Sequence, residues 1–197
     1  MLDWLKSLAM TAVPLFIVMD TFGNLPLVIE VTEGLPSRQQ HKIIHIATLT
    51  AALIGLVFLL FGRLILALMN ISLASFAIAS GIILLVFSIR YLLTGETVEL
   101  VRDELLAISP LGTPLLAGPA IITTILLLSL QYPVYIVLIS FAVNLVLAWI
   151  IFNAKDKIMK FMGQGGLKAV GNVFNLLLAA IAASMIFRGL SLLGVIQ

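Results

Sequence analysis

The chain contains no cysteine, so disulfide bonds, thiolate metal sites and cysteine nucleophiles are excluded. Charge is also scarce: 10% of the 197 residues are Asp, Glu, Lys or Arg, against about 25% in an average soluble domain. The net charge is +2 and no stretch is basic enough to form a phosphate-binding stripe, so no nucleic-acid partner is expected. A chain with so little polar surface is not expected to stay dissolved in water.

Apolar residues dominate instead. They make up 62% of the chain, and the mean hydropathy is +1.23. A span needs about 20 mostly apolar residues, and a helix satisfies its own backbone groups in hydrocarbon. Six segments meet this requirement: residues 7–31, 43–61, 71–89, 105–131, 134–153 and 169–187. We therefore expect an all-α membrane protein, a single polytopic domain over residues 1–197 with six transmembrane helices, whose first span is retained rather than cleaved as a signal peptide.

The basic residues predict an orientation in the lipid bilayer. The side that holds both termini carries only Lys6, Arg63 and Arg188. The other side, with the loops after the first, third and fifth spans, carries Arg38, Lys42, Arg90, Arg102, Lys155, Lys157, Lys160 and Lys168. Because cytoplasmic loops are enriched in Lys and Arg, we expect both termini to face outward from a plasma (inner) membrane.

Six spans divide naturally into two repeats of three. An odd number of spans per repeat makes the second copy enter the membrane upside down, an arrangement common in secondary transporters. A shift of 93 residues aligns the first three spans with the last three and places Pro119 on Pro26. We expect inverted repeats over residues 1–95 and 96–197.

Matched breaks interrupt the first and fourth spans. The first break runs from Asp20 to Pro26, and the second runs from Thr113 to Pro119. Proline removes a backbone donor, glycine permits non-helical conformations, and proline suits the first position of a new helix. Both spans are therefore expected to break mid-membrane into half-helices that start at Pro26 and Pro119, with Asn24 in the capping position of the first. The alternative is a pair of ordinary proline kinks, which membrane helices tolerate.

Such breaks have the chemistry of a binding site. New helix starts offer free N–H groups and a partial positive charge to a carboxylate, while unwound carbonyls accept bonds from an ammonium group or hold a cation. Donors on one side and acceptors on the other suit a zwitterion. The candidate substrate-binding residues are Asp20, Thr21, Gly23, Asn24, Pro26, Thr113, Pro114, Ala117, Gly118, Pro119 and Thr123.

Asp20 is the only acid well inside a span. A carboxylate at the bilayer centre costs at least ~2.5 kcal/mol, so it needs a cavity, a partner or a proton. It could contact a substrate ammonium, exchange a coupling proton or bind a sodium ion. The alternative is a structural cap that accepts N–H bonds from the segment after it.

Other polar residues carry weaker signals. His41 and His45 have a spacing that can bind metal, but no acid completes a set, so we interpret them as interfacial histidines and expect no metal. The chain has no HExxH motif, no phosphate-binding Walker loop and no second intramembrane acid, so we expect neither an enzyme nor a cofactor. Ser75 and Ala79 are spaced for close helix packing. The asparagines expected to bond between helices are Asn144, Asn172 and Asn175.

The two breaks resemble motifs of the MarC family of bacterial and archaeal membrane proteins, and Ala79–Leu85 is similar to a third. The resemblance covers nearly the whole chain. It implies six spans, a plasma-membrane location and, for the SnatA branch, transport of glycine, alanine, serine or threonine. Family members commonly have Asp-Pro where this chain has Asp20-Thr21. The substrate-site residues that the resemblance implies are Asp20, Gly23, Asn24, Ala117, Gly118 and Pro119.

The sequence thus predicts a secondary transporter of small neutral amino acids. The coupling ion, H⁺ or Na⁺, is left open, and the small size is compatible with a homo-oligomer. A channel-like pore and a non-transport membrane scaffold are the alternatives. A transporter should give saturable flux and accelerated exchange, a channel should pass current without exchange stimulation, and a scaffold should do neither.

Overall fold

The computed structural model describes residues 2–94 and 118–195. All regular structure in these two ranges is helical, as expected, with no strand. The helices are α1 (Leu2–Met19), α2 (Leu25–Thr32), α3 (Ser37–Leu68), α4 (Leu73–Thr94), α6 (Pro119–Gln131), α7 (Val134–Asn153) and α8 (Lys155–Leu192).

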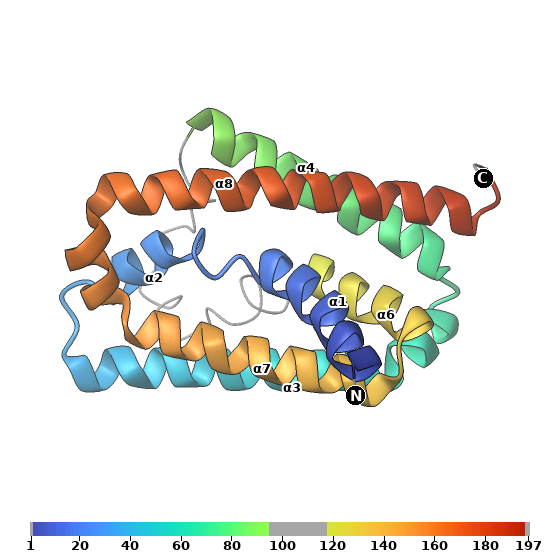
Figure 1. Cartoon of the computed structure of the whole chain (residues 1–197), viewed down its shortest axis with the longest axis horizontal. Coiled ribbons are helices and arrows are strands. Elements are labelled where there is room, and N and C mark those ends of the chain that lie inside the picture. Colours follow the sequence, from blue (N-terminus) through green and yellow to red (C-terminus); the bar gives the residue numbers. More distant parts are fainter. Residues whose placement is uncertain (1, 95–117, 196–197) are drawn as a thin grey trace.

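Long helices frame the molecule and short ones fill it. Helices α3 and α7 lie along one side and α4 and α8 along the other, while α1, α2 and α6 lie between the two pairs (Figure 1). By length and composition, α3, α4, α7 and α8 can each cross a membrane, with mean hydropathies between 2.0 and 2.6. At about 1.5 Å per residue, even the 20-residue α7 rises about 30 Å, the thickness of the hydrocarbon core.

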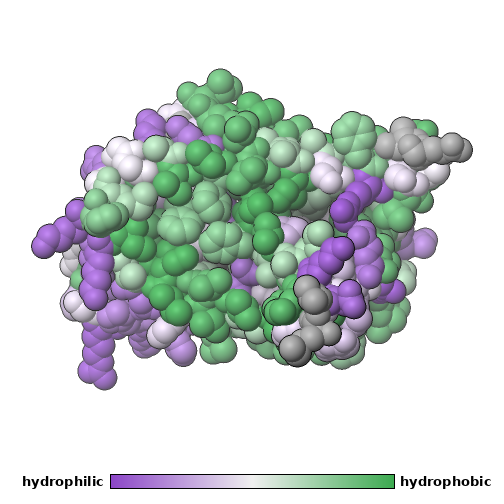
Figure 2. Space-filling model, in the orientation of Figure 1, coloured by the Kyte–Doolittle hydropathy of each residue, from purple (hydrophilic) through white to green (hydrophobic). Residues whose placement is uncertain are grey.

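The surface has the pattern of a protein surrounded by lipid. Apolar side chains cover the middle of the face in Figure 2, and hydrophilic residues gather toward its ends. Large apolar side chains such as Leu53, Val86 and Val146 point outward from α3, α4 and α7. A band of this extent exceeds the apolar patches that soluble monomers expose. The chain is an integral membrane protein that crosses the bilayer several times.

Helices α4 and α8 approach each other closely at two glycines. A Cβ on Gly81 would lie 2.8 Å from the carbonyl oxygen of Ala182, and a Cβ on Gly189 would lie 2.8 Å from that of Ala74. Small residues allow such close contact between membrane helices, where dispersion and packing replace the hydrophobic effect. The two helices therefore meet backbone to backbone.

The small residues that make this contact differ from the expected pair. Ser75 and Ala79 are exposed, whereas Ala74, Ala77 and Gly81 are buried. The expectation for Ser75 and Ala79 in this contact is wrong, because neighbouring residues of a helix point about 100° apart and spacing alone does not fix which face turns inward.

A buried polar cluster joins α1 to α7. The hydroxyls of Thr11 and Ser140 lie 2.6 Å apart, and Asn144 Nδ2 donates to the Ala12 carbonyl at 3.1 Å. The expected interhelical bond of Asn144 is therefore confirmed. Asn175 donates only within α8, and Asn172 is exposed on that helix.

Several boundaries extend beyond the apolar segments. Helix α3 begins at Ser37 and α8 begins at Lys155, both in polar stretches that hydropathy does not mark as spans. Helix α8 also contains a non-helical residue, Gly163, with φ 65° and ψ 177°. Residues 95–117, which include the first part of the expected fourth span, lie outside the described ranges.

Candidate functional site

The first predicted break is present in the structure. Helix α1 ends at Met19 and α2 begins at Leu25. The five residues between them form turns and not a continuous helix. Asp20 has φ 45°, in the left-handed region that aspartate enters more readily than most residues. Asn24 N–H donates to the Asp20 carbonyl at 2.9 Å and closes the turn. This is more than a proline kink, since α1 accommodates Pro14 without interruption.

The Asp20 carboxylate is held by the turn itself. Its Oδ1 accepts the N–H of Gly23 at 3.2 Å, which is the capping arrangement considered as the structural alternative. A Cβ on Gly23 would lie 2.3 Å from Asp20 Oδ2, so glycine is required for the carboxylate to lie against the backbone. Within the described residues Oδ2 has no hydrogen-bond partner. The cap therefore leaves one carboxylate oxygen available.

Thr21 stands out by its unpaired hydroxyl. Its side chain is fully buried, and Oγ1 is the only buried side-chain nitrogen or oxygen in the described ranges without a hydrogen-bond partner. Leaving such a group unsatisfied costs roughly 1–3 kcal/mol. The hydroxyls of Thr11, Thr32 and Thr124, by contrast, all have partners. A buried polar group left free beside a carboxylate is available to a ligand.

Asn24 and Pro26 begin the second half-helix. Asn24 occupies the N-cap position, but its side chain makes no cap hydrogen bond. Its Nδ2 donates instead to the Met19 carbonyl at 3.2 Å, so it ties the start of α2 to the end of α1. Pro26 lies in the first turn of α2, as expected. The predicted position of Asn24 is confirmed, while its side chain acts across the break.

The second break is described only from Gly118 onward. Pro119 begins α6 and Gly118 is its N-cap residue, as expected, with the Gly118 carbonyl accepting the N–H of Ile121 at 3.0 Å. The other predicted residues of this break, Thr113, Pro114 and Ala117, lie outside the described residues. Helix α6 has 13 residues and rises about 20 Å, too short to cross the hydrocarbon core alone.

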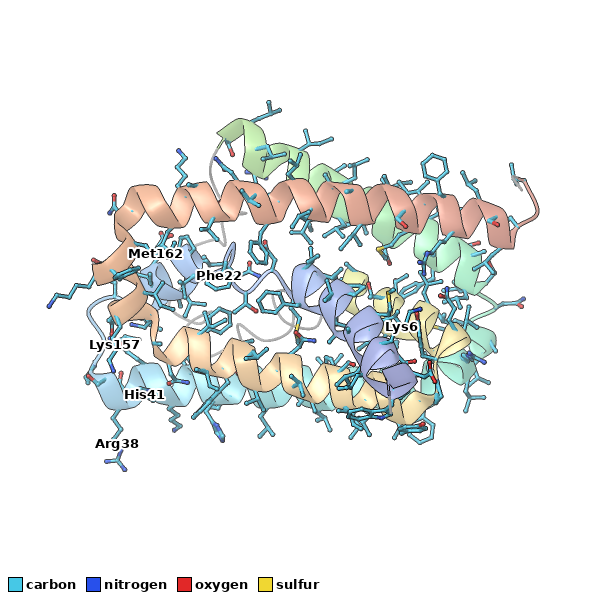
Figure 3. All side chains as sticks on the ribbon, in the orientation of Figure 1. Lys6, Phe22, Arg38, His41, Lys157 and Met162 are labelled. Atoms are coloured by element: carbon cyan, nitrogen blue, oxygen red, sulfur yellow. The ribbon has the colours of Figure 1, made fainter. Side chains whose placement is uncertain are left out.

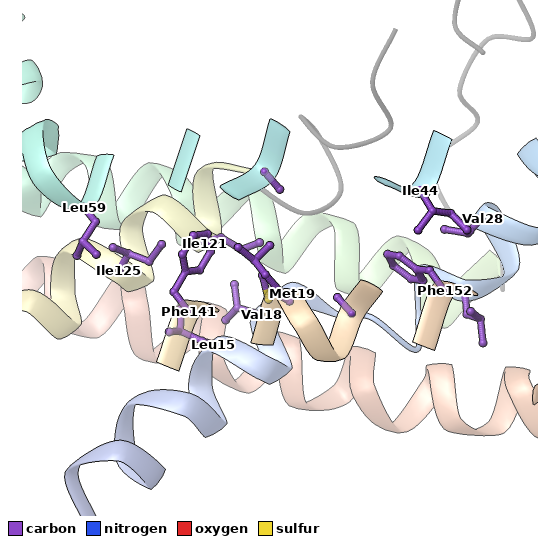
Figure 4. Packing of buried hydrophobic residues seen from close by; sticks show 14 of the residues in the cluster. Leu15, Val18, Met19, Val28, Ile44, Leu59, Ile121, Ile125, Phe141 and Phe152 are labelled. Carbon is purple, nitrogen blue, oxygen red and sulfur yellow. The ribbon is translucent and has the colours of Figure 1, made fainter. Parts of the chain in front are cut away.

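The core brings the end of α1 close to the start of α6. Met19, the last residue of α1, and Ile121, near the start of α6, belong to one buried apolar cluster (Figure 4). Eight consecutive residues of α6 are buried, so this short helix is surrounded by protein on all sides. A half-helix in the fourth span stays a prediction, because the part of that span before Gly118 lies outside the described residues.

The hydroxyl of Thr123 already has hydrogen-bond partners within the protein. It lies 2.7 Å from Ser80 Oγ of α4 and 2.8 Å from the Pro119 carbonyl. Thr124 bonds only to a carbonyl of its own helix. A contact between Thr123 and substrate stays a prediction, and it would require the bond to Ser80 to open.

Residues missed by sequence reasoning surround the first break. Tyr91 of α4 is buried and packs over Gly171 of α8, one turn before Phe174. Phe22, inside the break, packs against Phe174 of α8 with ring centroids 5.3 Å apart. These contacts join residues far apart in the sequence, and no spacing pattern indicates them.

Metal-binding groupings are not found in the part of the chain that the structure describes, where no three His, Cys, Asp or Glu residues come together. His41 Nδ1 contacts Asn153 Oδ1, so this histidine pairs α3 with the end of α7. His45 is exposed on α3.

Comparison with known proteins assigns the family. The model of the MarC family integral membrane proteins matches residues 5–193. The inner membrane protein YhgN of Escherichia coli, a UPF0056 protein, is 31% identical over 193 residues, covering 94% of this chain and 97% of its own length. A UPF0056 membrane protein of Methanocaldococcus jannaschii is 29% identical, covering 89% and 92%. No solved structure gives a significant match. The chain belongs to the MarC (UPF0056) family of integral membrane proteins.

Proposed function

We propose that the protein is a secondary transporter of small neutral amino acids, with the substrate held at the break between α1 and α2. The observation that carries this proposal is the pair of free polar groups there, the buried Thr21 Oγ1 and the Oδ2 of the partly buried Asp20. An amino acid would bring an ammonium group to the carboxylate and a polar partner to the hydroxyl. Its own carboxylate would bind at the half-helix starts, Asn24–Pro26 and Gly118–Pro119.

The energetics favour a cationic partner for Asp20. A charged carboxylate at membrane depth costs at least ~2.5 kcal/mol, and a single backbone N–H offsets only part of that. A substrate ammonium would supply the missing charge, and a coupling proton or sodium ion would do so when the site holds no substrate. The resemblance to the SnatA branch supports glycine, alanine, serine and threonine as the substrate class.

The proposed architecture is one membrane domain of six spans in two inverted repeats, residues 1–95 and 96–197. Discontinuous helices at corresponding places in the two repeats are typical of transporter binding sites. Support for the direction of insertion comes from Figures 1 and 3: the first turns of α1, with Lys6, and the last turns of α8 lie toward one end, while Arg38 and Lys157 lie at the other. We place the Arg38 end in the cytoplasm and the termini outside an inner membrane.

The same contacts suggest how access alternates. Helix α1 is tied to α7 by the Thr11–Ser140 and Asn144 hydrogen bonds, whereas α4 packs on α8 through Gly81 and Gly189. Each pair would move as one body, and the non-helical turn at the break would absorb the change. A rocking motion of this kind would expose the site to one side at a time.

Counterflow in proteoliposomes tests the proposal. Labelled glycine, alanine and threonine are presented outside vesicles loaded with the unlabelled amino acid, with wild type and the Asp20→Asn and Thr21→Val variants side by side. Thr124→Val is the matched control, because the Thr124 hydroxyl bonds only within its own helix. We expect stimulated uptake in wild type and Thr124→Val and impaired uptake in the other two.

The alternatives give different results. Absence of exchange with every neutral amino acid, in protein shown to be folded, would overturn the substrate class. Current without exchange stimulation would indicate a channel-like pore, and the absence of both would indicate a scaffold.

A further inference from the structure

The first two turns of α8 form a separate structural unit at the end of the bundle. We call residues Lys155–Met162 the end segment; it lies between α7 and the non-helical Gly163, whose φ of 65° lets the chain turn. Figure 1 shows this part of α8 running across the end of the bundle, crosswise to the rest of the helix. If α7 and α8 cross the membrane, the end segment lies along its surface.

The end segment has two different faces. Ile158, Met159 and Met162 are partly buried and pack against the apolar core. Phe161 is 92% exposed, and Lys157 and Lys160 are exposed with it. One face therefore belongs to the fold, and the other presents an aromatic ring and two lysines, beside the exposed Asp156 whose carboxylate is paired with Lys155.

A buried lysine holds the end segment in place. Lys155 is only 4% exposed, and its Nζ donates to Gln40 Oε1 at 2.7 Å and to Asp156 Oδ1 at 3.0 Å. Gln40 Nε2 in turn donates to the Leu35 carbonyl at 2.8 Å, so the end segment is fixed to the connection between α2 and α3. The orientation of the outward face is set by these bonds.

Other residues place this face at the level of a membrane boundary. Trp149, one turn before the end of α7, is exposed, as expected of an aromatic belt residue. Arg38, His41 and Lys157 gather at the same end in Figure 3. An exposed ring at this depth can insert among acyl chains while the lysines reach phosphate groups.

We infer that the outward face of the end segment binds the headgroups of anionic phospholipids, with Phe161 inserted into the adjoining leaflet. Basic residues beside a membrane are each worth about 1 kcal/mol toward anionic lipid, which corresponds to about fivefold in local preference. A second copy of the chain fits this face less well, since it would bring Lys157 and Lys160 against their own counterparts. This inference is independent of the substrate proposed above.

Fluorescence of a single tryptophan tests the insertion of Phe161. The full chain with Trp4→Phe, Trp149→Phe and Phe161→Trp is reconstituted in vesicles of equimolar phosphatidylcholine and phosphatidylglycerol, with bromine on the acyl chains of one lipid at a time. Brominated lipid is expected to quench the introduced tryptophan strongly. The same background with Met162→Trp in place of Phe161→Trp is the matched control, whose inward-facing ring is expected to be quenched much less.

The role of Lys157 and Lys160 in binding anionic lipid is tested by comparing quenching by an anionic lipid with quenching by a zwitterionic one. In the Phe161→Trp protein, brominated phosphatidylglycerol is expected to quench more than brominated phosphatidylcholine, and Lys157→Gln with Lys160→Gln is expected to bring the two toward equality. Lys6→Gln, at the other end of the molecule, is expected to change nothing. Equal quenching by both lipids without the lysine substitutions, or no quenching by either, would overturn the inference. Quenching that falls as the protein-to-lipid ratio rises would do so too, because it would show a second copy covering the face.

Discussion

The Thr21→Val variant tests whether the Thr21 hydroxyl serves to bind a ligand or to stabilise the fold. The change replaces the Thr21 hydroxyl by a methyl group in a fully buried site where Oγ1 has no partner in the described structure. An unsatisfied buried hydroxyl costs roughly 1–3 kcal/mol, so its removal should leave the free energy of unfolding unchanged or raise it by up to that amount. Loss of transport in such a variant could not then be blamed on a weaker fold.

A threonine that has a partner provides the comparison. Thr123→Val removes the contact at 2.7 Å with Ser80, which joins α6 to α4. Hydrogen bonds between membrane helices contribute about 0.6 kcal/mol on average and up to about 1.7 kcal/mol. Valine at this position also leaves the Ser80 hydroxyl without its partner on α6. Thr123→Val should therefore lower the free energy of unfolding by about 1 kcal/mol.

Both variants can be measured by reversible unfolding in mixed detergent micelles, followed by the fluorescence of Trp4 and Trp149, with exchange activity measured on the same preparations. Retained stability with reduced amino acid exchange in Thr21→Val supports a ligand contact. The reasoning is refuted if Thr21→Val destabilises the protein as much as Thr123→Val, since the hydroxyl would then have a structural partner.

Further predictions follow from close contacts. Gly81→Ala places a Cβ 2.8 Å from a carbonyl of α8 and should cost about 1–3 kcal/mol in unfolding experiments, whereas Gly165→Ala, with no atom within 4 Å of its Cβ, should be neutral or slightly stabilising. Gly23→Ala forces the Asp20 carboxylate away from its backbone N–H and should reduce exchange, with a stability loss of about 1–2 kcal/mol; unchanged exchange would argue against the described geometry. Asn144→Leu removes the bond to α1 and should cost about 1 kcal/mol by the same unfolding assay; no loss would mean that the α1–α7 contact rests on apolar packing.

The first break was predictable from the sequence because its causes are local. Glycine and proline inside an apolar run conflict with helical geometry wherever they occur together, and the helix starts at Leu25 and Pro119 follow from that conflict. The membrane class was equally accessible, since span length and low charge follow directly from the thickness of hydrocarbon.

Other features depend on contacts that spacing cannot reveal. The packing of Tyr91 over Gly171 requires α4 and α8 to be placed in space, and the free hydroxyl of Thr21 emerges only once every neighbour is known. Hydropathy also overlooked the end segment, because four of its eight residues are charged and offset the four apolar ones in the average. An amphipathic helix at a surface has the wrong average composition for a span and is therefore left out of such a search.

The close contact between α4 and α8 has a consequence for biosynthesis. Helix α4 is complete once Thr94 has been made, but its partner is the last helix of the chain and ends at Leu192. At synthesis rates of about 5–20 residues per second, α4 waits on the order of ten seconds before Gly189 can reach it. During that time the surface of α4 around Gly81, which α8 covers in the folded protein, faces lipid or an insertion factor that accompanies the nascent chain. Assembly of this protein is therefore a late event, completed when its first half is joined by its last helix.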